Sequence, residues 1–188
     1  MVDIRRLARG VALQALYEID STTHPTGEVL TYRDAAAALQ NIDVRLLAYV
    51  ALREFHIEGD EAKFDEDLET STIVEDQLLP QPAQDLTHKL VKGVLEHRAK
   101  LDPVIQRYAP EWAVDQMAVV DRNILRIAIF ECVFTKETPI KVAINEAVEL
   151  AKTFGSDSAP AFVNGVLGSL ADNYDQVAAE LNPKQEPE

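Results

Sequence analysis

The segment from Pro139 to Leu170 constrains the fold more than any other part of the chain, because it predicts two consecutive helices with signals at their ends. Thr138 is a candidate N-cap, and Pro139 suits the first helical position, where a missing N–H costs nothing. Apolar residues then recur every three or four positions, which is typical of an amphipathic helix. These residues are Ile140, Ile144, Ala147, Ala151 and Phe154.

The second helix of the pair is expected over residues 159–171. Gly155 is the expected left-handed terminator of the first helix, and Ser156, Asp157 and Ser158 are candidate N-caps for the second. The apolar residues of the second helix are Phe162, Val163, Val166, Leu167 and Leu170. Because the join is only a few residues long, we expect the two helices to pack against each other.

Further helices are expected on the N-terminal side of this pair. Asp3 is a candidate cap for an amphipathic helix that runs to about Ile19. The segment from Asp121 to about residue 136 is apolar nearly all round after its candidate cap, which predicts a buried core helix. Other helices are predicted near 32–41 and 43–56, from Pro82 to a break at Pro103, and from there to a point before Pro110.

Acidic residues dominate the chain, whose formal net charge is −14. Residues 54–76 hold ten acids against one base, Lys63, and so contribute −9 of that charge. Nucleic acid repels an acidic protein, but the remainder of this chain is only mildly acidic. We expect residues from about 58 to 81 to form a mobile acidic loop, because blocks of like charge rarely pack.

Positive charge gathers at the start of the first predicted helix, where Arg5, Arg6 and Arg9 follow one another with no acid between Ile4 and Tyr17. One interpretation is an ordinary solvated helix face. The other is phosphate contact, because the planar guanidinium group suits phosphate oxygens and the Tyr17 ring can stack on a base. Arg122 and Arg126 are expected to pair with a carboxylate such as Glu131 or Glu146, with a functional role as the alternative.

The sequence contains no motif that predicts catalysis. It has no phosphate-cradling glycine loop, no dinucleotide-binding motif and no nucleophile elbow. The single cysteine, Cys132, lies in an apolar run, and the four histidines lack the spacing of metal ligands, so we expect no metal and no cofactor. No apolar run is long enough to span a bilayer, and a cytoplasmic protein with no membrane contact is expected.

Four stretches resemble the NusB family of transcription antitermination factors: RRLAR with ALQALYE, VDRNILRIAIFE, KVAINEAVELAKTFG and FVNGVL. The resemblance covers roughly residues 3–20 and 83–172. It implies an all-α, NusB-like bundle of about seven helices in two small helical subdomains. The whole chain, 1–188, would then be a single domain, with an acidic insertion within about 21–80 and a flexible tail at about 175–188.

The resemblance also implies a function without catalysis. NusB proteins bind the single-stranded boxA element of ribosomal RNA together with the ribosomal protein NusE, as part of the antitermination complex of RNA polymerase. It places the RNA on the arginine-rich first helix and near the acid at position 121. The turn from Gly155 to Ser158 is expected on the same surface because the helix after it presents free N–H groups and the positive end of its dipole to a phosphate. The RNA-binding residues expected are Arg5, Arg6, Arg9, Tyr17, Asp121, Lys152, Ser156, Asp157, Ser158 and Phe162.

Two alternatives remain open. An acidic helical adaptor or homodimer with weak RNA affinity is favoured by the net charge, and by Leu7 and Ala161 at positions where family members often carry a base. RNA methyltransferases that begin with a NusB-like domain are the other, although this chain has no glycine-rich site for a methyl donor.

Overall fold

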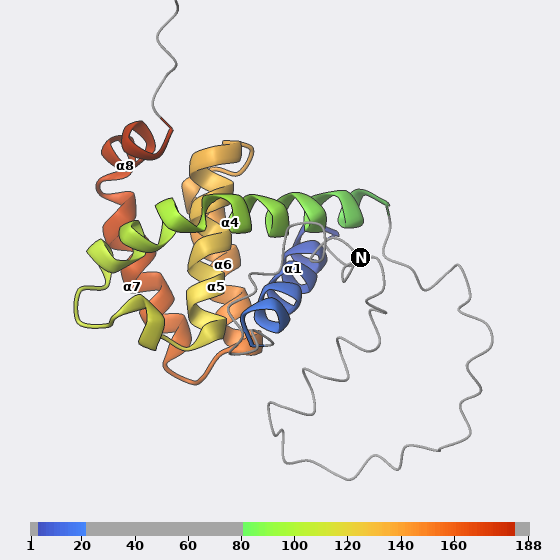
Figure 1. The fold of residues 1–188 in the computed structure, drawn as a ribbon, viewed down its shortest axis with the longest axis horizontal. Helices are drawn as coiled ribbons and strands as arrows, with labels where there is room; N and C mark the ends of the chain where they lie inside the picture. Colours follow the sequence, from blue (N-terminus) through green and yellow to red (C-terminus); the bar gives the residue numbers. More distant parts are fainter. Residues whose placement is uncertain (1–3, 22–80, 183–188) are drawn as a thin grey trace, which may run out of the picture.

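The computed structural model describes residues 4–21 and 81–182, and every regular element within them is helical (Figure 1). The predicted helices near 32–41 and 43–56 and the acidic segment 54–76 lie outside these residues. The elements are α1 (Ile4–Ser21), α4 (Gln81–Tyr108), the 3₁₀-helix η2 (Val114–Gln116), α5 (Val119–Ile129), the π-helix η3 (Phe130–Thr135), α6 (Ile140–Phe154), α7 (Ala159–Ala171) and α8 (Tyr174–Leu181). The all-α fold class is confirmed.

Helix α5 is the centre of the bundle, with α1, α4, α6 and α7 packed around it (Figure 1). All of its eleven residues except Val119 and Asp121 are buried, which confirms the prediction of a buried core helix. The helix begins at Val119, so Asp121 lies in its first turn and is not the cap that the sequence predicted. One continuous cluster of buried apolar side chains runs from Ala12 in α1 to Leu181 in α8.

Helices α6 and α7 cover the residues that the sequence predicted, and they pack against each other. Pro139 is the N-cap of α6, with ψ 142°, and not its first helical residue as predicted. The buried face of α6 is rotated from the predicted one, because its fully buried residues are Ala143, Ala147, Leu150 and Ala151. Ile140, Ile144 and Phe154 are only half-buried. A face of mainly small alanine side chains lets α6 approach its neighbours closely on two sides.

The turn between α6 and α7 does not have the predicted left-handed geometry. Gly155 has φ −95° and ψ 178°, which is extended backbone. Glycine is required there for a different reason: a Cβ would lie 2.5 Å from the Cβ of Ala159 and 2.8 Å from the carbonyl oxygen of Ala151. Ser158 precedes α7, but no side chain caps that helix by a hydrogen bond.

Two other boundaries differ from the predictions. Helix α4 continues through Pro103, which lies inside it. The hydrogen bond that this proline cannot donate would have gone to the carbonyl of Ala99, and both residues are exposed, so water can take the place of the missing donor. Helix α8 forms where a flexible tail was expected from about residue 175, because Val177 and Leu181 are buried.

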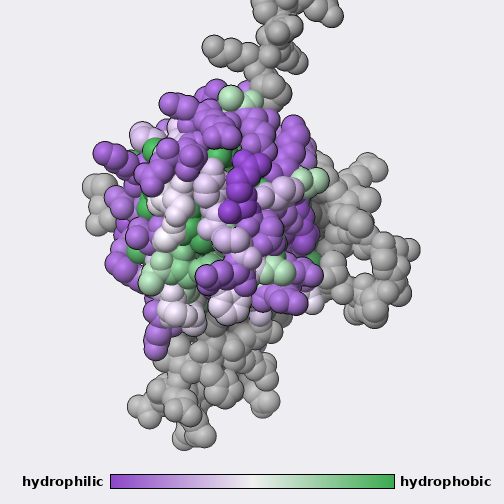
Figure 2. All heavy atoms as spheres, turned by 90° about the vertical axis from the view of Figure 1, so that its left-hand side faces the viewer, coloured by the Kyte–Doolittle hydropathy of each residue, from purple (hydrophilic) through white to green (hydrophobic). Residues whose placement is uncertain are grey.

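Charged and polar residues cover most of the surface on the side of α7 and α8, around a smaller area of weakly hydrophobic residues (Figure 2). The large hydrophobic side chains that are exposed among the described residues are Ile4, Trp112 and Val142. No helix in residues 4–21 and 81–182 is long and apolar enough to cross a membrane.

Glycine packing offers a test of this arrangement, because Gly93 in α4 and Gly165 in α7 are both helical but differ in surroundings. A Cβ on Gly93 would lie 1.8 Å from Cζ of the buried Phe130, whereas a Cβ on Gly165 meets nothing within 4 Å. We expect Gly93→Ala to lower the free energy of unfolding by about 1–2 kcal/mol, because overpacking exceeds the gain in helix propensity. Gly165→Ala should raise it by up to about 1 kcal/mol. Denaturant titration measures both, and equal effects would contradict the packing of α4 on η3.

Candidate nucleic-acid interface

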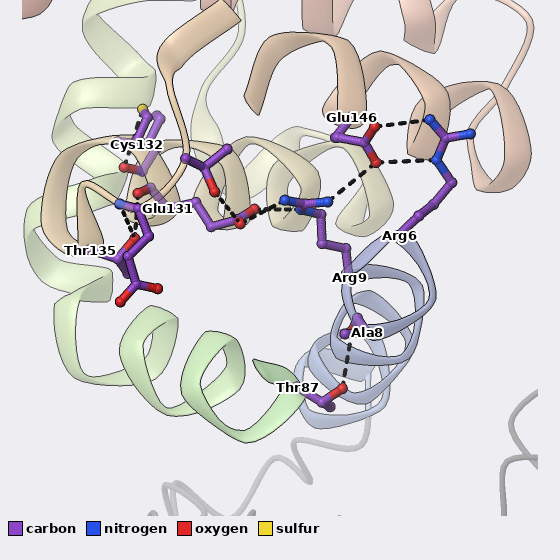
Figure 3. A network of polar contacts seen from close by, with 11 residues as sticks. Arg6, Ala8, Arg9, Thr87, Glu131, Cys132, Thr135 and Glu146 are labelled. Atoms are coloured by element: carbon purple, nitrogen blue, oxygen red, sulfur yellow. Dashed lines mark hydrogen bonds and ion pairs between the residues drawn. The ribbon is translucent and has the colours of Figure 1, made fainter. Parts of the chain in front are cut away.

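The predicted RNA-binding arginine Arg9 is buried, with 3% of its surface exposed. Its Nε and Nη2 atoms donate to the two carboxylate oxygens of Glu131, at 2.7 and 2.9 Å, and its Nη1 donates to Oε2 of Glu146 at 3.3 Å. Figure 3 shows its guanidinium group between these two acids. The expected exposure of Arg9 is therefore wrong, because its guanidinium group is buried between Glu131, which is buried, and Glu146, which is largely buried.

Thr138, which the sequence predicted to cap α6, binds Glu131 instead. Its hydroxyl donates to Oε1 of Glu131 at 2.9 Å and makes no cap hydrogen bond to α6. Glu131 lies in η3, where the helix widens to a π-helix before it ends at Lys136, which has a left-handed φ of 56°. The carboxylate that receives Arg9 therefore comes from a locally altered helix, and such segments often occur at functional sites.

Arg6 extends the same network toward solvent. Its Nε and Nη2 atoms donate to Oε2 and Oε1 of Glu146 at 3.2 and 2.9 Å, and about half of its side chain is exposed (Figure 3). Glu146 therefore joins the buried Arg9 to the surface residue Arg6, and Arg5 beside it is exposed. This arrangement fixes the N-terminal half of α1 against α6.

Lys152 lies in the last turn of α6, six positions after Glu146. Its Nζ donates to Oε1 of Glu149 at 2.8 Å, and both side chains are exposed. The pKa of Glu149 lies below its usual value, mainly because of the hydrogen bond from Lys152, then because of the charge of Lys152 and, more weakly, that of Arg6. Arg6 and Lys152 thus pair with different acids of α6, Glu146 and Glu149, which lie three positions apart.

The turn after α6 continues this surface, because Ser156, Asp157 and Ser158 are all exposed. Asp121 adjoins the turn: its Oδ1 lies 3.3 Å from the position of a Cβ on Gly155 and accepts no hydrogen bond from a described residue. Burial raises the pKa of the Asp121 carboxyl. The start of α7 offers fewer backbone donors than predicted, because the N–H of Ala159 donates to the Ser156 carbonyl and Pro160 has no N–H.

The two predicted aromatic residues are partly accessible. Tyr17 and Phe162 are each half-buried and pack against the core. Gly10 in α1 lies against the ring of Phe154 at the end of α6, at 3.8 Å from the position of a Cβ, so the two helices are in close contact there. The structure thus brings Arg5, Arg6, Lys152 and the turn to adjoining elements, and it removes Arg9 from their surface.

Arg122 and Arg126 form a second buried network, and their carboxylate partners differ from those predicted from the sequence. Arg126 donates to Asp102 and to Asp20, and Arg122 donates to Asp20, instead of the predicted Glu131 or Glu146. Asp20 comes from the last turn of α1, so this network ties the end of α1 to α5 and α4. No spacing in the sequence links position 20 to these arginines. Among residues 4–21 and 81–182, no group of acids, histidines or cysteines is arranged to hold a metal ion.

This all-helical bundle, with exposed cations on α1 and α6, belongs to a class of helical proteins that has known members. Residues 42–172 match the model of the NusB family. The transcription antitermination protein NusB of Roseiflexus castenholzii is 38% identical over 93% of this chain and 96% of its own length. The protein of the same name from Chloroflexus aggregans is 42% identical over 90% of this chain and 88% of its own. The chain therefore belongs to the NusB family.

A solved structure shows the same fold. A crystal structure of the antitermination factors NusB and NusE in complex with double-stranded RNA contains a chain that superposes with a TM-score of 0.59. That chain is 22% identical, and the match covers 93% of this chain and all of the other. The family and the bundle expected from the sequence are thus confirmed.

The different burial of Arg9 and Arg6 predicts different effects on stability. Arg9→Ala leaves Glu131 buried without its ion-pair partner, so we expect the free energy of unfolding to fall by about 3–5 kcal/mol. Arg6→Ala breaks a half-exposed pair and should cost at most about 1 kcal/mol. Denaturant unfolding measures both variants. Equal costs would show that the Arg9–Glu131 pair is not buried as described.

Proposed function

We propose that this protein is a transcription antitermination factor that binds boxA-type single-stranded RNA together with the ribosomal protein NusE. The observation that carries the proposal is that α1 and α6 are in contact and carry the exposed cations Arg5, Arg6 and Lys152, with the exposed turn after α6 next to Lys152 in the chain. The names of its relatives support the role in antitermination. The structure of NusB with NusE and RNA supports the choice of partners.

The RNA surface in this proposal differs from the one expected from the sequence. Arg5, Arg6 and Lys152 supply the charges that contact phosphates, and the positive end of the α7 dipole lies beside Ser158. Tyr17 and Phe162 offer ring edges and faces to unstacked bases. Arg9 takes the role of a positioning residue, because it holds Glu146, which in turn orients Arg6.

The negative net charge of this chain is consistent with a basic protein as its partner. Ribosomal proteins are generally basic, and a chain with a net charge of −14 attracts a basic partner and speeds association with it. The proposed role is one of binding within the antitermination complex in the cytoplasm and needs no catalytic group. RNA and NusE would then use surfaces of different charge.

A second function is favoured by a specific observation. Arg6 and Lys152 both have carboxylate partners, and Arg9 is buried, so RNA affinity without NusE should be low. An acidic adaptor or homodimer that binds proteins and only weakly binds RNA fits these contacts. An RNA titration distinguishes the two functions.

The decisive variant replaces Arg5, Arg6 and Lys152 together by alanine. If about three phosphates are neutralised, the slope of log affinity against log salt should be roughly −2 for the wild type. The triple variant should bind boxA-type RNA more weakly, with a slope near zero, because it lacks the charges that displace counterions. The measurement is a fluorescence titration at several salt concentrations, with and without NusE.

Arg107→Ala is the matched control. Arg107 is also an exposed arginine with two hydrogen bonds to one carboxylate, but its partner is Glu180 in α8. This variant should keep the affinity and the salt slope of the wild type. Unchanged RNA binding by the triple variant would reject the proposed surface and leave the adaptor function.

A further inference from the structure

We infer that Glu149 is an affinity-limiting residue of the RNA surface, an internal carboxylate that competes with RNA phosphates for Lys152. This inference rests on the proposed function and adds a residue that was not among the expected contacts. Its basis is the pairing of the surface cations with two acids of α6, Glu146 and Glu149, which lie three positions apart.

The two acids differ in how firmly they are held. Glu146 has 13% of its side chain exposed and receives both Arg6 and the buried Arg9. A phosphate that took Arg6 from Glu146 would leave that acid with only its longer contact to Arg9, at 3.3 Å. Exchange at this position is therefore unfavourable, and Glu146 acts to orient Arg6 while it stays in place.

Glu149 has no such second anchor among its hydrogen bonds in the described residues. Its one side-chain ion pair there is with Lys152, at 2.8 Å, and the two side chains are 42% and 58% exposed. Exposed pairs between neighbouring helix residues are weak and exchange readily with solvent and ions. A phosphate can therefore replace the Glu149 carboxylate at the Lys152 ammonium group without uncovering a buried charge.

The position of Glu149 makes the competition effective. Lys152 donates to it, and the charge of Arg6 also lowers its pKa, so the acid is ionised at neutral pH. A phosphate that contacts Lys152 must approach this negative charge at short range, where repulsion remains appreciable even in water. Stable retention of RNA then requires further contacts, with bases or through the partner protein, because phosphate contacts alone are weakened.

The test is to replace Glu149 by glutamine, which removes the charge and keeps the size of the side chain. We expect Glu149→Gln to tighten binding of a boxA-type RNA by about threefold to tenfold, on the basis of the repulsion between unit charges a few ångströms apart. A shuffled RNA of the same composition should gain by a similar factor. The salt slope should stay near the wild-type value, because the same three cations neutralise phosphates and only the repulsion from Glu149 is removed.

Glu180→Gln is the matched control for the loss of an exposed, ion-paired carboxylate. Glu180 accepts both hydrogen bonds of Arg107, and like Glu149 it has a pKa below its usual value, mainly because of the hydrogen bond from its partner. This variant lowers the net negative charge by the same amount, so a gain caused by net charge alone would appear in it equally. We expect its affinity and salt slope to match those of the wild type.

The outcomes separate the inference from the proposed function. If the wild type binds the boxA-type RNA and Glu149→Gln binds with the same affinity and salt slope, the inference is wrong and the proposed function stands. An equal gain in Glu149→Gln and Glu180→Gln also overturns the inference, since it shows an effect of net charge. If neither the wild type nor Glu149→Gln binds RNA, with or without NusE, both the proposed function and the inference fail.

Discussion

The buried ion pair between Arg9 and Glu131 determines how the N-terminal helix sits on the rest of the bundle. Each side chain is about 5% exposed or less, so neither charge can be left without its partner at small cost. The pair joins α1 to η3, and Glu146 extends it to α6. At the other end of α1, Asp20 accepts hydrogen bonds from Arg122 and Arg126 of α5. Buried charges thus fix α1 at both ends, while apolar packing fills the space between them.

Under the proposed function, this anchoring is what lets an acidic protein present a local surface for RNA. The fixed helix places Arg6 against Glu146 near the middle of α6, and Lys152 and the turn follow further along the chain. The acids Glu146 and Glu149 lie between these cations, so the surface is not a simple basic patch. In the proposed function, Glu146 orients Arg6 because it is largely buried, and the more exposed Glu149 competes with phosphate for Lys152. Such a surface would favour RNA that offers more than its phosphates.

The parts of the fold that could be predicted from the sequence are those specified by local signals. The ends of α6 and α7 follow from Pro139, Gly155 and the apolar periodicity, and the burial of α5 follows from its composition. Contacts between distant residues could not be predicted in this way, because spacing carries no information about which acid meets Arg9 or Arg126. Arg9 was expected at the surface on that account. The continuation of α4 through Pro103 could not be predicted either. A proline usually ends a helix, but this one is exposed, so the helix continues.

The most direct test of the anchoring of α1 is a double-mutant cycle between Arg9 and Glu131, with Arg9→Met and Glu131→Gln measured singly and together by denaturant unfolding. Arg9→Met leaves the buried Glu131 without its ion-pair partner, and Glu131→Gln leaves the buried Arg9 with only its longer contact to Glu146, so each should be destabilising. The double variant should lose less than the sum of the single losses, by more than about 1 kcal/mol, because contacting buried charges are coupled. Losses that add to within about 0.5 kcal/mol would contradict the account, since they would show that the two charges act independently in the folded protein.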